Sequence, residues 1–251
     1  MDFSPDPGTL EQTPVSALSR YSLGRQIAQG GMGIILEAED TWLNRPVAVK
    51  RMLTENHVES ERPRFWREAF VLARLAHPNI VPIHDIGEDE TGTPFYAMKL
   101  IRGQTLESVI RSLREVTNRP KDRSVYSLDR LLISFRKVCD AVAFAHGQGI
   151  IHRDLKPDNI MVGEFGEIQV MDWGLAKDLR ETLPAMSSGA LNPSSEDACD
   201  LGKTLDGDVM GTPRYMAPEQ AEGRVADHDE STDVFLLGGV LYAILALRAP
   251  L

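Results

Sequence analysis

Apolar residues between Tyr21 and Ile101 fall mostly in short runs or alternate with polar residues, which is the pattern of β-strands. The segments with this pattern are YSLGRQIAQ, IILEAED, RPVAVKRML, VPIHDIGE and PFYAMKL. One segment differs: in RPRFWREAFVLARLA, apolar residues from Phe65 to Leu75 recur every three or four positions, as on one face of a helix. The pattern of apolar residues in this part of the chain therefore predicts a β-rich unit with a single helix.

After Gly103 the spacing of apolar residues becomes helical. The segments TLESVIRSLREV and SLDRLLISFRKVCDAVAFAHGQG predict two helices, the second of which begins at a capping residue, Ser127, and ends near Gly147–Gly149. We therefore place a boundary at 101–103 between a β-rich lobe and a helical lobe. No period is sustained over 176–210, and so long a loop in a compact domain is usually functional or disordered.

The longest apolar run, VFLLGGVLYAILAL, covers the 14 residues from Val234 to Leu247. A helix that spans a bilayer needs roughly 18–20 apolar residues. We therefore interpret this run as a buried core helix and expect no membrane span.

Composition narrows the classes of partner and compartment. A net charge of −10 argues against a general nucleic-acid binder, which normally presents a basic face, but not against a nucleotide substrate. The two cysteines, Cys139 and Cys199, have neither metal nor disulfide spacing, which favours a reducing, cytoplasmic location. Residues 1–20 lack an apolar core, so we expect a flexible leader and not a signal peptide.

Gly30, Gly31 and Gly33 lie between two predicted strands. Glycines without a Cβ let backbone N–H groups approach a phosphate, although on this feature alone a plain hairpin turn is the better interpretation. Lys50 ends the next strand, and Glu68 lies in the predicted helix. Each is an ordinary surface charge by itself, but together they could form a buried ion pair that orients the ammonium group.

The segment IIHRDLKPDNIMVGEFGEIQVMDWG gathers polar groups around a short predicted hairpin, IMV and EIQV on either side of GEFG. Asn159 follows Asp154 by five residues, and Asp172 comes directly after the hairpin. Amide and carboxylate oxygens are ligands that Mg²⁺ prefers. Asn159 and Asp172 are therefore candidate metal ligands, which leaves Asp154 free to accept a hydroxyl proton.

Six segments, AQGGMGII, VAVK, REAF, HRDLKPDN, DWG and GTPRYMAPEQ, occur in this order. Protein kinases carry a glycine-rich loop, a strand lysine, a helix glutamate, H-R-D-L-x-x-x-N, D-F-G and A-P-E in the same order. From Tyr21 to Leu251 the chain therefore resembles a serine/threonine protein kinase, and GGMG and YMAPEQ look like its bacterial, eukaryotic-like branch.

The resemblance implies an α+β, two-lobed fold: a small antiparallel β lobe with one helix at 21–101, and a larger, mainly α lobe from 102. The activation segment would be 172–219. ATP would bind between the lobes. In the nucleotide site Met98 would be the gatekeeper, the backbones of Lys99 and Ile101 would bind adenine, and Ile27, Ile35, Ala48 and Met161 would enclose its ring.

The resemblance also assigns catalytic roles. Lys50, held by Glu68, would contact the α- and β-phosphates below the glycine loop. Asp154 would act as the base toward the hydroxyl group of a protein substrate, Lys156 would neutralise the transferring phosphate, and Asn159 and Asp172 would hold Mg²⁺. Lys156 and Thr212 are the residues that serine/threonine kinases usually have at these places.

Arg153, which precedes the catalytic aspartate, implies control by phosphorylation, because such an arginine can pair with a phosphate on the activation segment. The candidate acceptors are Thr182, Ser187, Ser188, Ser194, Ser195, Thr204 and Thr212. We favour Thr204 first and Thr212 second, and expect autophosphorylation there.

The sequence departs from the family pattern at three places. Ala28 stands where the first glycine of the loop is usual, so we expect weaker ATP affinity. Trp173 replaces the usual phenylalanine, so we expect a shifted balance between active and inactive states. Trp173 should pack near Leu72 and Ile83. The third departure is at the end: the chain stops soon after the apolar run at 234–247, so we expect a truncated large lobe, with Glu219 lacking its usual arginine.

Two readings of function follow. The first is an active ATP-dependent serine/threonine kinase, since each residue required for the chemistry is present. The second is an inactive, regulatory or nucleotide-binding module of the same fold, whose apolar helix at 234–247 is covered by a partner protein or by a missing C-terminal region. A small-molecule phosphotransferase is disfavoured, because such enzymes normally lack the GTPRYMAPEQ segment.

Overall fold

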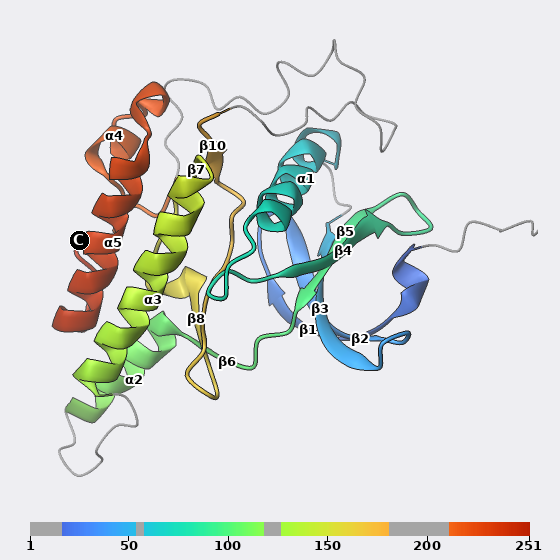
Figure 1. Cartoon of the computed structure of the whole chain (residues 1–251), viewed down its shortest axis with the longest axis horizontal. Helices are drawn as coiled ribbons and strands as arrows, with labels where there is room; N and C mark the ends of the chain where they lie inside the picture. Colours follow the sequence, from blue (N-terminus) through green and yellow to red (C-terminus); the bar gives the residue numbers. More distant parts are fainter. Residues whose placement is uncertain (1–16, 54–57, 118–126, 181–210) are drawn as a thin grey trace, which may run out of the picture.

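The computed structural model of the 251-residue chain describes residues 17–53, 58–117, 127–180 and 211–251. A β-rich lobe lies beside a helical lobe (Figure 1). The predicted two-lobed α+β fold is therefore confirmed.

The small lobe is built on one sheet of strand order β1-β2-β3-β5-β4, in which all neighbouring strands are antiparallel. Its strands are β1 (Tyr21–Gln29), β2 (Gly33–Asp40), β3 (Arg45–Met52), β4 (Ile83–Glu88) and β5 (Pro94–Lys99). Along β3, Val47 and Val49 pack with Tyr21 and Phe95 in one small core, whereas Ala48 belongs to the main core. The alternation of side chains along a strand thus separates the two faces and turns the face that bears Ala48 and Lys50 toward the helix.

Helix α1 (Val58–Arg74) is the only α-helix among the described residues of the small lobe. The predicted apolar face is buried, with Phe65, Ala69 and Leu72 at most 3% exposed. The helix begins earlier than its apolar spacing indicated, so Pro63 lies inside it and removes one intrahelical hydrogen bond. Ahead of β1, Ala17–Arg20 of the expected leader form the short 3-10 helix η1, and residues 1–16 lie outside the described part of the chain.

The helical lobe carries α2 (Leu106–Thr117), α3 (Leu128–Gly147), the short α4 (Pro218–Ala221) and α5 (Glu230–Ala246). As predicted, Ser127 caps α3, accepting a hydrogen bond from the N–H of Arg130 at 3.3 Å. The 3-10 helix η2 (Pro157–Asn159) follows the catalytic loop, and η3 (Val225–Asp227) precedes α5.

Small sheets join the two lobes. Strands β6 (Gly103–Thr105), β8 (Ile160–Gly163) and β9 (Ile168–Val170) form one sheet, and β8 and β9 are the hairpin that the sequence predicts. Strands β7 (Ile150–Ile151) and β10 (Lys177–Asp178) form another. The loops that leave β7 and β9 carry the candidate residues Asp154 and Asp172.

The apolar run at the end of the chain forms most of α5, but only one side of the helix is buried. Leu236, Val240 and Ile244 are in the core, whereas Val234, Phe235 and Leu245 are at least half exposed. The interpretation of this run as a core helix therefore holds for one side of α5, and its other side is exposed in the described residues. In the described residues, no helix is both long enough and apolar enough to cross a membrane.

Candidate catalytic site

Lys50 and Glu68 form the buried ion pair that the sequence suggested. The Lys50 Nζ lies 2.7 Å and 2.6 Å from the two carboxylate oxygens of Glu68, and both residues are buried. Lys50 is the register partner of Tyr96 on β5, and the Tyr96 hydroxyl donates to Glu68 Oε1 at 2.8 Å. Burial, followed by the charge of Glu68, raises the pKa of Tyr96 well above its usual value. Tyr96 is therefore a permanent donor that fixes the carboxylate of Glu68 against Lys50.

Asp154 lies at the centre of a hydrogen-bonded group in the loop after β7. Its Oδ2 accepts from Lys156 Nζ at 2.8 Å, and its Oδ1 accepts from the Thr212 hydroxyl at 2.9 Å. Lys156 also donates to Thr212 at 2.6 Å. Residues from two distant segments thus converge on one carboxylate, which their hydrogen bonds orient.

Asn159 is tied to the same carboxylate. Its Nδ2 donates to the Asp154 backbone oxygen at 2.8 Å and to Oδ2 at 3.1 Å, so the amide oxygen points away from that contact. Asp172 is exposed and lies near Tyr96, whose pKa its charge also raises. The described residues contain no cluster of three or more His, Cys, Asp or Glu with a metal-binding arrangement. An Asn–Asp pair still fits Mg²⁺, which usually binds one or two protein oxygens and takes its other ligands from phosphate and water.

The loop that follows β7, at residues 152–156, is held by the buried carboxylate of Asp233 on α5. This carboxylate accepts from the backbone N–H groups of His152 and Arg153, each at 2.8 Å, and also contacts His146 Nε2 at 2.8 Å. Arg153 has a φ of 67°, a left-handed conformation that costs a non-glycine residue free energy. The bonds to Asp233 hold the loop in this conformation.

The ring of His152 is fixed by two further bonds. Its Nδ1 accepts from the Asp154 N–H at 3.2 Å, and its Nε2 lies 3.0 Å from the Met171 carbonyl, which requires the hydrogen to be on Nε2. Its ring centroid lies 4.5 Å from that of Trp173. His152 therefore links the catalytic aspartate to the segment that carries Asp172.

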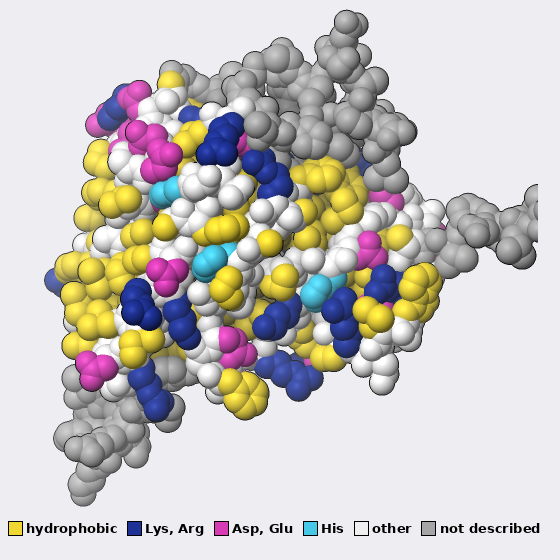
Figure 2. Space-filling model, in the orientation of Figure 1, with side chains coloured by type: hydrophobic (Ala, Val, Ile, Leu, Met, Phe, Trp, Pro, Cys, Tyr) yellow, Lys and Arg dark blue, Asp and Glu magenta, His cyan; other side chains and the backbone are white. Residues whose placement is uncertain are grey.

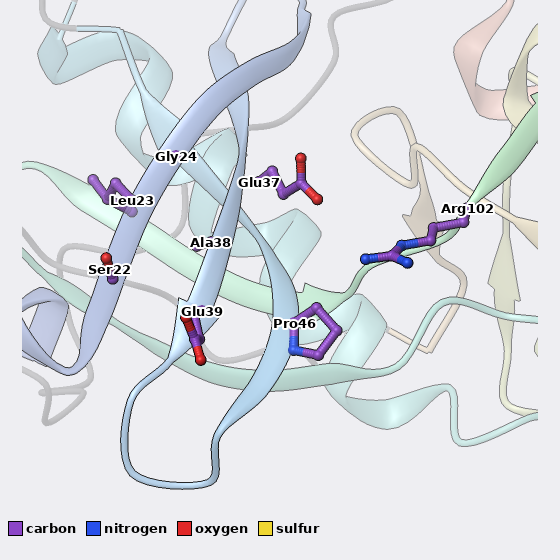
Figure 3. A pocket seen from close by; sticks show the side chains of 8 residues that line it. All are labelled: Ser22, Leu23, Gly24, Glu37, Ala38, Glu39, Pro46 and Arg102. Carbon is purple, nitrogen blue, oxygen red and sulfur yellow. The ribbon is translucent and has the colours of Figure 1, made fainter.

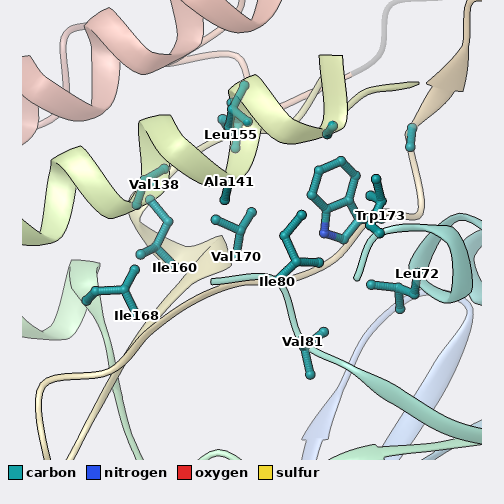
Figure 4. Close-up of a cluster of buried hydrophobic side chains, with 14 of the residues drawn as sticks. Leu72, Ile80, Val81, Val138, Ala141, Leu155, Ile160, Ile168, Val170 and Trp173 are labelled. Atoms are coloured by element: carbon teal, nitrogen blue, oxygen red, sulfur yellow. The ribbon is translucent and has the colours of Figure 1, made fainter. Parts of the chain in front are cut away.

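Trp173 is buried in the same cluster as Leu72 and Ile80 (Figure 4). Ile83, the other neighbour expected from the sequence, packs against that cluster. No described residue gives the indole N–H a hydrogen-bond partner. Such an unpaired buried donor costs roughly 1–3 kcal/mol, so the tryptophan fills the core but destabilises this arrangement of the segment.

The glycine loop closes over this segment. A Cβ added to Gly174 would lie 2.9 Å from the terminal carbon of Met32 and 3.5 Å from a carboxylate oxygen of Glu68. A Cβ at Gly33 would lie only 2.7 Å from the Arg51 carbonyl, so β2 and β3 can approach only with glycine there. Gly31 at the tip has open space around it, as a backbone that receives a phosphate requires.

The residues predicted to hold adenine come from both lobes. Ile27, Ile35 and Ala48 are on β1, β2 and β3, Met98 and Lys99 end β5, Ile101 follows them, and Met161 is on β8. Ala48 and Met98 are register partners and both are buried. The Lys99 N–H donates to the Pro82 carbonyl at 3.1 Å, which leaves only the Lys99 carbonyl for a ligand.

A groove of about 460 Å³ lies next to this region, over β1 and β2 (Figure 3). It is lined by Ser22, Leu23, Gly24, Glu37, Ala38, Glu39, Pro46 and Arg102. None of the predicted nucleotide or catalytic residues lines it, so it is distinct from the candidate site.

Arg153 also carries a buried cationic group. Its Nε donates to the Leu175 carbonyl at 2.6 Å, while no described residue accepts from its buried Nη1. Burial lowers the pKa of Arg153 to about 10; the charge of Arg67 acts in the same direction, and that of Asp233 opposes it. This guanidinium would be stabilised by an anion. Thr204 and the other candidate acceptors at 182–195 lie outside the described residues.

Some residues of the site had no predicted role. Tyr96 could be found only from the pairing of β3 with β5, and Asp233 is marked in the sequence only by its place at the start of an apolar run. Gln220 of α4 donates to the Arg153 carbonyl at 2.7 Å and so ties that helix to the catalytic loop. Glu219, expected to lack an arginine, accepts from the Thr232 hydroxyl at 2.6 Å.

Comparisons with known proteins agree with this geometry. The family model described as "Protein kinase domain" matches residues 21–251. A serine/threonine-protein kinase PknD of Chlamydia felis is 39% identical over 245 residues, which cover 93% of this chain and 25% of that protein. The protein of the same name from Protochlamydia amoebophila is 37% identical over 234 residues, 92% of this chain and 23% of the relative. The chain thus spans about a quarter of the length of these curated relatives.

Proposed function

This chain belongs to the protein kinase family, and from that premise we propose that it transfers the γ-phosphoryl group of ATP to serine and threonine hydroxyls of proteins. The observation that carries the proposal is the group formed by Asp154, Lys156 and Thr212, in which one carboxylate is oriented by an ammonium and a hydroxyl. The intact Lys50–Glu68 pair supports it, because a buried carboxylate already holds the ammonium in place.

Asp154 accepts a hydrogen bond from the hydroxyl of the substrate and takes its proton as the new bond to phosphorus forms. Lys156, beside this carboxylate, offsets the charge of the phosphoryl group during transfer. Lys50 binds the α- and β-phosphates and is held in place by Glu68. Much of the catalysis then consists of positioning and charge stabilisation by groups that are already ordered.

Asn159 and Asp172 are the residues that would hold Mg²⁺. The metal, when bound, offsets the charge of the phosphate oxygens. Asn159 has one side of its amide fixed on Asp154, and Asp172 has a φ of 59°, a strained conformation for a residue other than glycine. The fold therefore fixes the Asn159 amide and the backbone that carries Asp172 before a ligand binds.

The nucleotide would lie between the lobes, with adenine enclosed by Ile27, Ile35, Ala48 and Met161. Met98 would close the back of the pocket, and the Lys99 carbonyl and the Ile101 N–H would bind the adenine edge. The support for this proposal is that Ala48 and Met98 are buried register partners on neighbouring strands. Gly30, Gly31 and Gly33 would cover the phosphates.

Phosphorylation of Thr204 would supply the anion that the buried guanidinium of Arg153 lacks. Thr212 is the weaker candidate for modification, because its hydroxyl already binds Asp154 and Lys156. We place this chemistry in the cytoplasm, on the ground of its cysteine usage; Cys139 is unpaired.

The exposed apolar side chains of α5 and α3 indicate a further partner. They comprise Val234, Phe235, Tyr242 and Leu245 on α5 and Leu128, Leu132 and Ile133 on α3. Figure 2 shows apolar side chains gathered along the left edge of the molecule, where Figure 1 places α5. We propose that a partner protein or further sequence of a longer protein covers this face.

Incubation with Mg²⁺ and labelled ATP, followed by mass spectrometry, tests the proposal. The parent chain should become phosphorylated on serine or threonine, Lys50→Ala should not, and Thr204→Ala should retain ATP binding with less activity. Glu88→Gln, on the outer end of β4, is the control. Equal, negligible phosphorylation of the parent and Lys50→Ala, with ATP still bound by the parent, would favour the inactive nucleotide-binding module.

A further inference from the structure

Strand β10 lies between the two lobes, and its two residues reach in opposite directions. Lys177 Nζ donates to the carbonyls of Val225 and His228, both at 3.1 Å, in the segment that leads into α5. Asp178 Oδ2 accepts from Arg74 Nη1, on α1, at 2.6 Å. Side chains of successive strand residues point to opposite faces. This short strand therefore contacts the small lobe with one residue and the helical lobe with the next.

The ion pair between Arg74 and Asp178 is less exposed to solvent than most ion pairs at a protein surface. The Asp178 side chain is only 4% exposed, and that of Arg74 is 31% exposed. Asp178 also accepts from the Arg180 N–H at 2.9 Å, and Arg74 donates to the Gln148 carbonyl at 3.3 Å. An exposed ion pair contributes little because solvent screens it and the side chains lose entropy. Here Asp178 and Arg74 each make a second hydrogen bond, which already holds the side chain in place.

Helix α1 carries Glu68 and Arg74 six residues apart, which places them about 9 Å apart along its axis. Glu68 binds Lys50 of the sheet, and Arg74 binds β10. At the other end of the helix, Arg62 forms an ion pair with Glu88 and donates to the Gly92 carbonyl at 2.8 Å. Movement of the Arg74 end away from β10 would turn the helix about its outer attachment and draw Glu68 from Lys50.

Asp178 also interacts electrostatically with a second arginine of α1, Arg67. Arg67 is seven residues, or about two turns, before Arg74 on the same side of α1. Burial together with Arg64 lowers the pKa of Arg67, while the charge of Asp178 acts in the opposite sense. The charge of Arg67 in turn lowers the pKa of Arg153. Asp178 therefore offsets part of a repulsion among arginines of α1 and of the catalytic loop. Without this carboxylate, the charge of Arg67 would be less compensated.

We propose that the Arg74–Asp178 ion pair is a positioning contact, which holds α1 so that Glu68 stays on Lys50 and thereby links the nucleotide site to β10. This inference rests on the proposed kinase function for its effect on rate. The pair touches no substrate; it acts through Glu68. Because Lys177, next to Asp178 on β10, binds the segment before α5, the ion pair also makes the position of α1 depend on that segment.

The substitution Asp178→Asn tests the proposal, because it removes the charge and keeps the shape. We expect a fall of about fivefold in kcat with a smaller change in the KM for ATP, the size of a typical coupling between contacting groups. Hydrogen exchange of the α1 amides should become faster in the same variant. Glu88→Gln is the matched control, since it removes the ion pair at the other end of the same helix.

The double substitution Arg74→Asp with Asp178→Arg restores the attraction with exchanged charges. We expect it to recover part of the kcat and of the slow exchange that either single substitution loses. Equal effects of Asp178→Asn and Glu88→Gln on α1 exchange, or no recovery in the exchanged pair, would overturn the proposal. If the parent chain transfers no phosphate, the proposed function fails, but the exchange of α1 still decides whether the contact positions the helix.

Discussion

Single residues in this site are held by neighbours that the motifs do not reveal. Lys50, Glu68, Asp154, Asn159 and Asp172 could be identified from the sequence, because each occupies a fixed place in a short motif. The residues that hold them in place could not be identified in this way. Tyr96 reaches Glu68 only because β3 pairs with β5, and Asp233 reaches the catalytic loop from α5, more than 70 residues further along the chain.

The substitution Tyr96→Phe isolates one such support. It removes the hydroxyl that donates to Glu68 Oε1 and leaves a buried carboxylate with one bond fewer. Bonds to charged groups contribute roughly 1.5–3 kcal/mol, so we expect the free energy of unfolding to fall by about 2 kcal/mol and kcat to fall severalfold. Tyr242→Phe, at an exposed position of α5, is the control for urea denaturation and steady-state rates. Unchanged stability in Tyr96→Phe would mean that the hydroxyl bond does not support Glu68.

At the scale of elements, the period of apolar residues located β1–β5, α1, α3 and the β8–β9 hairpin. It could not locate β7 and β10, because a strand of two residues has no period. It also could not tell which side of α5 is buried, because that helix is apolar all round. The turn between β4 and β5 is a contrasting case, in which local sequence determines the structure: Asp89 Oδ1 accepts from the N–H groups of Thr91 and Thr93.

This turn should make stability depend on pH. Burial raises the pKa of Asp89, but hydrogen bonds from Thr91, Thr93 and Arg51 outweigh it, and the pKa falls to about 2. A carboxyl whose pKa is lower in the folded state stabilises the fold above its unfolded pKa of about 4, and this stabilisation is lost as the pH falls toward 2. We expect Asp89→Asn to lower the free energy of unfolding by about 1–2 kcal/mol at pH 7, and by less at pH 3.

Urea denaturation of the parent and of Asp89→Asn at the two pH values measures this difference. Glu90→Gln is the matched control, since Glu90 is exposed in the same turn. An Asp89→Asn deficit of the same size at pH 7 and pH 3 would show that the carboxylate charge does not contribute.

At the scale of the whole molecule, the two lobes meet through residues that each lobe supplies to one site. The small lobe contributes the Lys50–Glu68 pair, and the helical lobe contributes Asp154, Asn159 and Asp172. The change from strand-like to helical spacing of apolar residues after Gly103 predicted a division into two lobes. It could not predict the contact between Arg74 and Asp178, because two charged residues 104 positions apart leave no pattern in one sequence.

Phosphate transfer to a protein substrate, compared between the parent and Asp154→Asn, tests the central claim most directly. ATP affinity is measured on the same samples, and Asp140→Asn, exposed on α3, serves as the control. We expect Asp154→Asn to bind Mg²⁺ and ATP about as well as the parent, while its kcat falls by about a hundredfold or more, as for the loss of a general base. Transfer to serine or threonine at the rate of the parent by Asp154→Asn would contradict the account.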